Sequence, residues 1–436
     1  MSIGAQDTLP LPPHPSLEQY KKRAKALLKA ARSGDPMALH GWAVAWLEKL
    51  AEHQPASERR PTRERIEREA KSLTQFARTK LGEGSLADAQ FVIARAHGFL
   101  SWSKLAAHVE ALARSSSEIS TFESAVNAII EGDETTLRRL LREHPELPRA
   151  RSTREHNATL LHHVSANGVE GYRQKSPKNA ARITELLLEA GAEVDARADV
   201  YGGGCTTLAL VATSVPPQLA GVQLPVIDVL LRHGARMDLP GIGGNDHALI
   251  RACLMNGQPE AARYLVSRGA PLDLSGAAGL GHVDALARFF DRDGQLTGAT
   301  RAQLLEAFSL ACAYGSAASV RFLLERGLDV NVRMKGHGDN HTGLHVAAFW
   351  GRVDVVDVLL ARGADVHAID DTWRTPPLSW ALTGWSRKDN EPERYYEIVA
   401  RLIAAGAKAK PETLEWAVSR GDAKMLAALG GTRPKN

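Results

Sequence analysis

Few cysteines and no long apolar run are the first features of this 436-residue sequence. Its three cysteines, Cys205, Cys253 and Cys312, lie far apart, which disfavours a disulfide framework and is typical of reduced thiols. No apolar stretch is long enough to cross a bilayer, and the first 15 residues lack the basic-then-apolar order of a signal peptide. These absences predict a cytoplasmic protein without a membrane partner.

Motifs of known catalytic sites are also absent. There is no nucleophile elbow, no H-E-x-x-H zinc motif and no pair of carboxylates in an evident pocket. The glycine runs at 202–204 and 241–244 match neither the P-loop nor the dinucleotide pattern, and turns with positive φ explain them better than a phosphate cradle. No cofactor and no enzymatic activity are therefore expected, although a triad assembled from separate repeats stays open.

The net charge of +4 is unevenly distributed. Residues 1–118 hold 18 Lys and Arg against 13 Asp and Glu, whereas the remainder holds 36 against 37 and is nearly neutral. Nucleic acid is thus not expected as a partner, because phosphate binding needs clustered positive charge. Arginines between Arg59 and Lys71 alternate with glutamates, which indicates a solvated helix rather than a basic patch.

One short pattern recurs seven times: an apolar helix end, a glycine, a small residue and an extended tail. The glycines are Gly191, Gly234, Gly269, Gly294, Gly327, Gly363 and Gly406, separated by 43, 35, 25, 33, 36 and 43 residues. A period near 33 residues is typical of stacked helical hairpins, and the glycine favours a left-handed helix end. About nine helix pairs are expected.

The best-defined unit, residues 341–367, opens with Thr342-Gly343-Leu344-His345 and resembles the ankyrin repeat. Similar openings occur at Thr159 to His162 and at Gly204 to Leu208, and the resemblance is weak around Gly294. It implies an all-α ankyrin-repeat solenoid with short β-hairpin fingers. The phrase at residues 86–110 is similar to a segment found before ankyrin repeats in bacterial proteins, which hints at a bacterial source.

Three regions are predicted along the chain. Residues 1–15 read as a flexible, proline-rich tail and residues 16–118 as an N-terminal helical cap, with N-caps at Ser16, Ser85 and Ser101. Residues 119–436 form the ankyrin-like array, ending in a more polar capping repeat.

Three insertions interrupt the period, each between the two helices of its pair: 168–179, 214–225 and 384–394. Stacking places equivalent points of successive repeats along one edge, so the inserts are expected to line a common rim, where repeat proteins often bind. The alternative is that these loops are merely tolerated.

Aromatic residues concentrate in residues 349–396. The resemblance implies that Phe349 and Trp350, which follow Ala347-Ala348, face the concave groove of the array. Exposed aromatics and arginines are common anchors of protein interfaces, whereas packing between repeats is the alternative. The predicted partner-binding residues are Phe349, Trp350, Trp373, Arg374, Trp385 and Tyr395, with packing favoured for Trp380 and Tyr396.

Histidines cluster in the same repeat. His337, Asp339 and His341 are weak candidates for a metal site, while the resemblance places His345 in the structural turn position of the repeat. No metal is expected, since a structural His345 with solvated neighbours in a glycine-rich finger explains the cluster better.

The function predicted from these features is a non-enzymatic scaffold that binds a protein or peptide through the groove and the insert rim, acting as a monomer. One rival is an enzyme or a small-molecule or metal-binding protein, whose pocket the inserts enclose and in which His163, His341 or His345 act. Another is a structural subunit that docks through the N-terminal cap.

Overall fold

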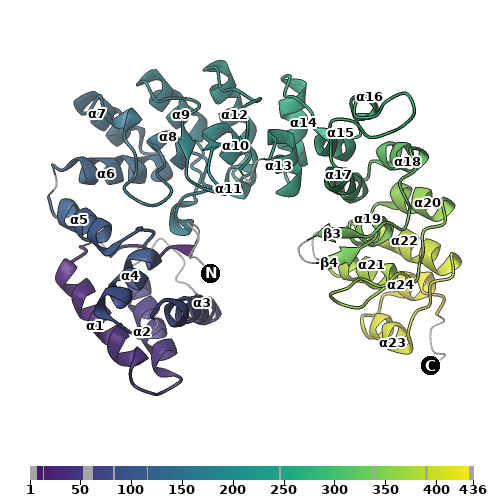
Figure 1. Ribbon diagram of the computed structural model, residues 1–436, viewed down its shortest axis with the longest axis horizontal. Coiled ribbons are helices and arrows are strands. Elements are labelled where there is room, and N and C mark those ends of the chain that lie inside the picture. The colour runs from purple at the N-terminus through teal and green to yellow at the C-terminus, as the bar shows by residue number, and fades with distance from the viewer. Residues whose placement is uncertain are drawn as a thin grey trace. The chain divides into compact units, whose positions relative to one another are not determined.

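The computed structural model describes residues 7–12, 14–52, 62–81, 84–114, 116–244, 247–336, 339–387 and 391–431. Its contacts divide the chain into two compact units, Met1–Tyr264 and Leu265–Asn436. Both units are built from pairs of helices, as Figure 1 shows, with two short β-hairpins in the described part of the chain. The predicted all-α repeat fold is confirmed.

The N-terminal region has five helices in its described residues: α1 (Leu17–Ala31), α2 (Ala38–Glu52), α3 (Arg63–Leu81), α4 (Leu86–Ala96) and α5 (Trp102–Leu112). Ser85 and Asp88 form the expected capping box, and Ser101 accepts a hydrogen bond from the Lys104 amide. Ser16 is the N-cap residue of α1, as predicted, but its side chain makes no capping hydrogen bond. Arg59 and Arg60 lie outside the described residues.

Part of the predicted tail packs against this region instead of standing free. Thr8 and Leu9 are buried, and the Leu9 amide donates to the Ala96 carbonyl at 2.7 Å. The Leu9 carbonyl lies 3.0 Å from Nδ1 of His97, a buried histidine at the end of α4. The interpretation of residues 1–15 as a uniformly flexible tail therefore fails at these residues, because Leu9 has an apolar site to fill.

Nine helix pairs follow in the described residues, which confirms the expected number. They are α6 (Glu118–Glu131) with α7 (Glu134–Glu143), α8 (Leu160–His163) with α9 (Ala180–Glu189), α10 (Thr207–Ala212) with α12 (Gln223–Arg232), α13 (Leu249–Met255) with α14 (Pro259–Ser267), α15 (Leu274–Leu280) with α16 (Val283–Ala287), α17 (Arg301–Tyr314) with α18 (Ala317–Glu325), α19 (Gly343–Phe349) with α20 (Val353–Ala361), α21 (Pro377–Trp385) with α22 (Pro392–Ala404), and α23 (Pro411–Ser419) with α24 (Ala423–Ala428). The boundary between the compact units falls within α14.

Short antiparallel hairpins form the fingers. In the first unit β1 (Arg197–Ala198) pairs with β2 (Cys205–Thr206), with Arg197 opposite Thr206. In the second unit β3 (Met334–Gly336) pairs with β4 (Asp339–His341), with Met334 opposite His341. Each hairpin leads directly into the first helix of the next pair: β2 is followed by α10, and β4 by α19.

The seven recurrent glycines all adopt left-handed backbone conformations, with φ between +80° and +101°. A side chain is disfavoured in this region of φ, which explains why a glycine follows the second helix in six pairs, after α9, α12, α14, α18, α20 and α22. Gly294 lies instead in the turn after α16, where its amide donates to the Asp291 carbonyl at 3.1 Å. The shortest spacing, 25 residues between Gly269 and Gly294, corresponds to the short helix α16.

Each unit has its own apolar core. In the second unit it runs through successive pairs from Leu274 to Leu429, with the fully buried Phe308 of α17 among its largest members. The N-terminal core gathers α1 to α5 around Trp46 and Phe99. No helix within the described residues combines the length and the apolar character that spanning a membrane requires.

Candidate functional site

Four aromatic side chains of the second unit form a continuous surface, here called the aromatic strip: Trp373, Trp380, Phe349 and Trp350. Successive ring centroids lie 5.4 Å (Trp373 to Trp380), 5.9 Å (Trp380 to Phe349) and 5.1 Å (Phe349 to Trp350) apart, each pair edge to face. This geometry is favourable for aromatic pairs and gives the strip a defined shape. It joins a finger tip to two neighbouring first helices, α21 and α19.

The two ends of the strip are the most exposed. Trp373 is 62% exposed and Trp350 44% exposed, while Phe349 and Trp380 are half-buried between them. Large exposed aromatics are unusual on a soluble monomer and often mark a binding surface. Of the predicted partner-binding residues, the structure thus brings Phe349, Trp350 and Trp373 together.

Asp370, which the sequence analysis did not identify, positions the finger end of the strip. Its buried carboxylate accepts hydrogen bonds from the amides of Thr372, Trp373 and Thr375, at 3.0, 2.6 and 2.9 Å. It also accepts from the Thr375 hydroxyl at 2.8 Å and from Nε1 of Trp380 at 3.2 Å. Burial raises the pKa of Asp370, but these donors outweigh it and hold the pKa well below its usual range.

Replacing this carboxylate by an amide is expected to loosen the finger. In Asp370→Asn the amide nitrogen must face some of the five donors, so we expect a loss of about 2–3 kcal/mol in the free energy of opening of the finger. Hydrogen exchange of residues 370–375 measures it. Asp371→Asn is the matched control: its side chain is 46% exposed and bonds Arg333 and Asn340, so a change below about 1 kcal/mol is expected. Equal effects of the two variants would contradict the positioning role.

The histidines behind Trp380 have structural surroundings. Nδ1 of His345 lies 2.9 Å from the Thr342 hydroxyl and Nε2 lies 3.2 Å from the Thr375 carbonyl, as expected for the turn histidine. Burial lowers the pKa of His345 to about 4. His341 is buried against the Trp380 ring, 5.3 Å between centroids.

The candidate metal site of this finger is described only in part. His337 lies outside the described residues, as does the side chain of Asp339. Among the residues the structure describes, no group of three or more metal-ligating side chains comes together.

Tyr395 does not belong to the exposed surface. Its side chain is 2% exposed, and its hydroxyl donates to the Phe349 carbonyl at 3.0 Å. It fills the space where α19 and α21 approach so closely that a Cβ on Gly384 would lie 2.2 Å from the Phe349 oxygen. The predicted role of Tyr395 as a partner contact is corrected: Tyr395 is buried and holds the backbone of Phe349.

Trp385 also departs from the predicted cluster. It is half-buried at the end of α21 and packs edge to face against Trp416 of α23, with centroids 5.1 Å apart. Arg420 covers both rings, at 5.6 and 4.9 Å. Trp385 therefore joins the C-terminal capping pair to the array, rather than extending the aromatic strip.

Two arginines flank the strip without a carboxylate partner among the described residues. Arg374 is exposed at the finger tip and adopts a left-handed backbone, φ +54°. Arg387, at the end of α21, lies over the rings of Phe349 and Trp350 at 5.4 and 5.1 Å. Arg352 instead points into the array, where Nε donates to the Ala313 carbonyl at 2.7 Å.

All three inserts lie between the helices of their pairs, and the first two are neighbours. Lys178 of the first insert donates to the Ala220 carbonyl of the second at 2.8 Å. The second insert forms a short helix, α11 (Val215–Leu219), whose Leu219 is 81% exposed. The third insert is described only in part, since residues 388–390 lie outside the described ranges.

The first insert carries a buried ionic network that the sequence analysis missed. Glu170 pairs with Arg154 from the preceding loop and lies 3.6 Å from Arg173, which in turn pairs with Glu123 of α6. The side chains of Arg154 and Glu170 are each 1% exposed. His156 adds a contact of 3.4 Å to Glu170, so the insert is tied into the protein rather than turned toward solvent.

This network also anchors the N-terminal region. Arg154 donates to the His97 carbonyl at 2.7 Å, and the Glu155 amide donates to the Gly98 carbonyl at 2.9 Å. Burial raises the pKa of Glu123, but Arg173 and Arg154 outweigh it and hold the pKa at about 2. The same two arginines hold the pKa of Glu170 well below its ordinary value. His163, a residue of the enzyme alternative, is buried beside this network.

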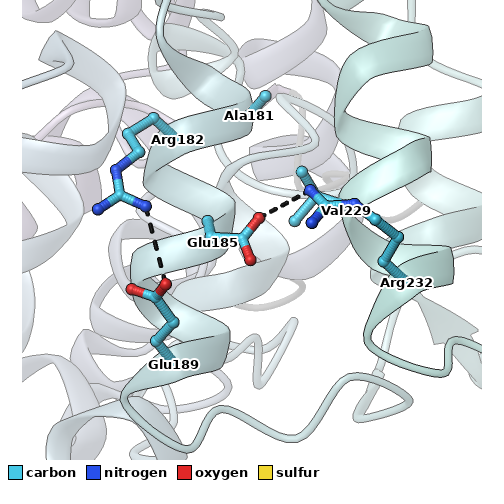
Figure 2. A pocket seen from close by; sticks show the side chains of 6 residues that line it. All are labelled: Ala181, Arg182, Glu185, Glu189, Val229 and Arg232. Atoms are coloured by element: carbon cyan, nitrogen blue, oxygen red, sulfur yellow. Dashed lines mark hydrogen bonds and ion pairs between the residues drawn. The ribbon is translucent and has the colours of Figure 1, made fainter.

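A shallow hollow lies between α9 and α12 of the first unit (Figure 2). Its two arginines and two glutamates pair with each other: Arg232 with Glu185 at 2.9 Å and Arg182 with Glu189 at 3.8 Å. Because these charges are mutually satisfied, the hollow presents no group poised for chemistry.

Comparison with known proteins places the repeats in a family. Residues 274–370 match the family model of ankyrin repeats in three copies. Over 97 residues the chain is 35% identical to the palmitoyltransferase Hip14 of Drosophila melanogaster, covering 22% of this chain and 13% of that protein. Over 49 residues it is 51% identical to ankyrin repeat domain-containing protein 49 of Bos taurus, covering 11% and 19%.

A third curated relative is the E3 ubiquitin-protein ligase hecd-1 of Caenorhabditis elegans, 45% identical over 65 residues, or 15% of this chain and 2% of that protein. The chain therefore spans less than a fifth of the length of these relatives. Among solved structures, the ankyrin repeat domain of human ASB11 is 19% identical with a TM-score of 0.33, covering 66% of this chain and 99% of that chain.

Proposed function

This chain is an ankyrin-repeat protein, and on that premise we propose that it is a non-enzymatic scaffold that binds a protein or peptide on the aromatic strip. Ankyrin repeats generally mediate protein–protein interactions through surfaces built from successive repeats. The observation that carries the proposal is the continuous strip with two exposed tryptophans, 44% and 62%, at its ends. We extend the proposal to the insert rim, where Leu219 is exposed.

The support beneath the strip favours binding. Tyr395 fixes the Phe349 backbone, and Asp370 fixes both Trp373 and Trp380. A surface whose backbone and central indole are held in place before a partner arrives loses less conformational entropy on binding. The four rings of the aromatic strip then act as anchors that become buried when a partner binds.

The double variant Phe349→Ala/Trp350→Ala is expected to abolish partner capture. Two anchors of this kind contribute about 2 kcal/mol each, or about 4 kcal/mol together, so the expected loss in affinity is about 700-fold. Affinity capture from a lysate of the source organism, with the wild-type chain beside the variant, measures it by the proteins retained.

Met37→Ala serves as the control, because Met37 is also a large exposed apolar residue, 64% exposed, but lies in the N-terminal region. The control is expected to retain the same proteins as the wild type, and both variants to keep the wild-type circular dichroism. Retention of every captured protein by the double variant would refute the assignment of the strip.

A further inference from the structure

Two arginines, Arg374 and Arg387, flank the aromatic strip, and their positive charge indicates the chemistry of its partner. We propose that the strip binds an acidic segment of a protein: a short extended stretch in which apolar residues lie between Asp or Glu residues. This inference rests on the proposed function and specifies the partner class. Three observations support it.

The first observation is the length of the strip. Its three steps between ring centroids, 5.4, 5.9 and 5.1 Å, together span no more than about 16 Å. An extended chain advances about 3.3 Å per residue, so about five residues cover the strip. Alternate side chains of such a segment can pack on the rings, so we expect the residues at the centre of the bound segment to be apolar.

The second observation is the position of the two arginines. Arg374 follows Trp373 at the finger end, and Arg387 lies over Trp350 and Phe349 at the other end. A guanidinium held against an aromatic face keeps its outer edge available for a carboxylate, with which it forms paired hydrogen bonds. Carboxylates near both ends of the bound segment match this arrangement.

The third observation is that the neighbouring acidic side chains are already engaged. Asp370 is buried and accepts five hydrogen bonds, and Asp371 pairs with Arg333 at 2.8 Å. Glu391, at the start of α22, pairs with Arg394 at 2.8 Å. The surplus charge of the described surface is therefore positive, which favours an acidic partner and opposes a basic one.

A peptide selection on the full chain tests the proposal. A random heptapeptide display library is selected on the wild-type chain, on Phe349→Ala/Trp350→Ala and on the double reversal Arg374→Glu/Arg387→Glu. We expect wild-type binders to be enriched in Asp and Glu around an apolar centre, and to be lost on the aromatic variant. In fluorescence anisotropy at 0.15 M salt, the reversal is expected to weaken the best acidic peptide about tenfold.

The matched control is Arg139→Glu/Arg142→Glu on α7 of the first unit, which changes the net charge equally on an exposed helix face. It is expected to alter the affinity less than twofold. If the selected peptides need the aromatic residues but are neutral or basic, or if the reversal has no effect, the acidic partner is overturned while the proposed function stands.

Two further outcomes are decisive. If no selected peptide depends on Phe349 and Trp350, both the acidic partner and the proposed function are overturned.

Stacked rings beside arginines are also found in single-strand nucleic-acid sites, so a labelled ten-nucleotide oligo-dT is titrated in parallel. Tighter binding of this oligonucleotide than of every acidic peptide would overturn the proposal in favour of nucleic acid.

Discussion

Replacing Glu170 by glutamine is expected to lower the free energy of opening of helices α5 to α9 by about 3–5 kcal/mol. The substitution keeps the shape of the side chain but removes its charge. Arg154, whose side chain is 1% exposed, then loses the carboxylate that compensates its burial. Hydrogen exchange measured by mass spectrometry reports the opening free energy segment by segment, and α19 to α22 should stay unchanged.

Glu143→Gln is the matched control for this experiment. Glu143 pairs with Arg139 one helical turn earlier, but the two side chains are 44% and 51% exposed, so a change below about 0.5 kcal/mol is expected.

A second variant separates the effect of the charge from the effect of packing. Arg154→Met/Glu170→Leu removes both charges, and because no unpaired ion remains it should recover much of the loss. If Glu170→Gln behaves like the control, the buried network does not stabilise the first unit.

Much of the fold follows from local signals in the sequence. All seven glycines have positive φ, and six of them follow the end of a helix, where a left-handed residue is needed; Gly294 lies instead in a turn after α16. The capping box of Ser85 and Asp88 is a local pattern and forms as expected. Ser16 takes the predicted N-cap position without a capping hydrogen bond, since its neighbours in sequence do not decide whether its hydroxyl faces the helix amides.

The site was only partly predictable because its residues meet across repeats. Phe349 and Trp373 are separated in sequence by helix α20, yet both contact Trp380. The sequence placed Tyr395 and Trp385 near this group but could not show which way they turn. Tyr395 turns inward to the Phe349 carbonyl, and Trp385 turns to Trp416.

The first insert shows the same limit. Its Glu170 and Arg173 look like residues of a solvated loop, because their partners, Arg154 and Glu123, lie 16 and 50 residues earlier in the sequence. A signal was present in retrospect: Glu170, Tyr172 and Arg173 stand close together in an insert with few other charges. Only the fold shows that the four ions neutralise each other in a buried site.

Acidification is expected to unfold the first unit before the second. Four buried histidines of the first unit have a lowered pKa: His97, His108, His162 and His163. Burial lowers the pKa from the ordinary 6.5 to about 3 for His97 and His163, and to about 4 for His108 and His162. The unfolded chain binds these protons near pH 6.5, whereas the folded chain does not, so stability is complete above pH 6.5 and declines as the pH falls toward 3–4.

The size of the effect follows from the same linkage. Each histidine costs about 1.4 kcal/mol per pH unit below 6.5, so at pH 5 each costs about 2 kcal/mol and the four together about 8 kcal/mol. A typical folded domain has only about 5–15 kcal/mol of stability. In the second unit His345 has its pKa lowered to about 4, and its titration is expected to cost that unit about 2 kcal/mol at pH 5. Hydrogen exchange at pH 7 and pH 5, corrected for intrinsic rates, compares the two units directly.

The variant His163→Gln identifies the histidines as the cause. Glutamine does not titrate in this range, so the pH dependence of opening in the first unit should fall by about 1.4 kcal/mol per pH unit, whatever the variant does to stability at pH 7. His163 suits this test because its two ring nitrogens have no hydrogen-bond partner among the described residues, and Arg173 and His156 oppose its protonation while Glu170 and Glu123 favour it. Equal loss of protection in both units at pH 5, or an unchanged slope in His163→Gln, would show that acid acts elsewhere, for instance on the carboxylates of Glu123 and Glu170 below pH 4.5.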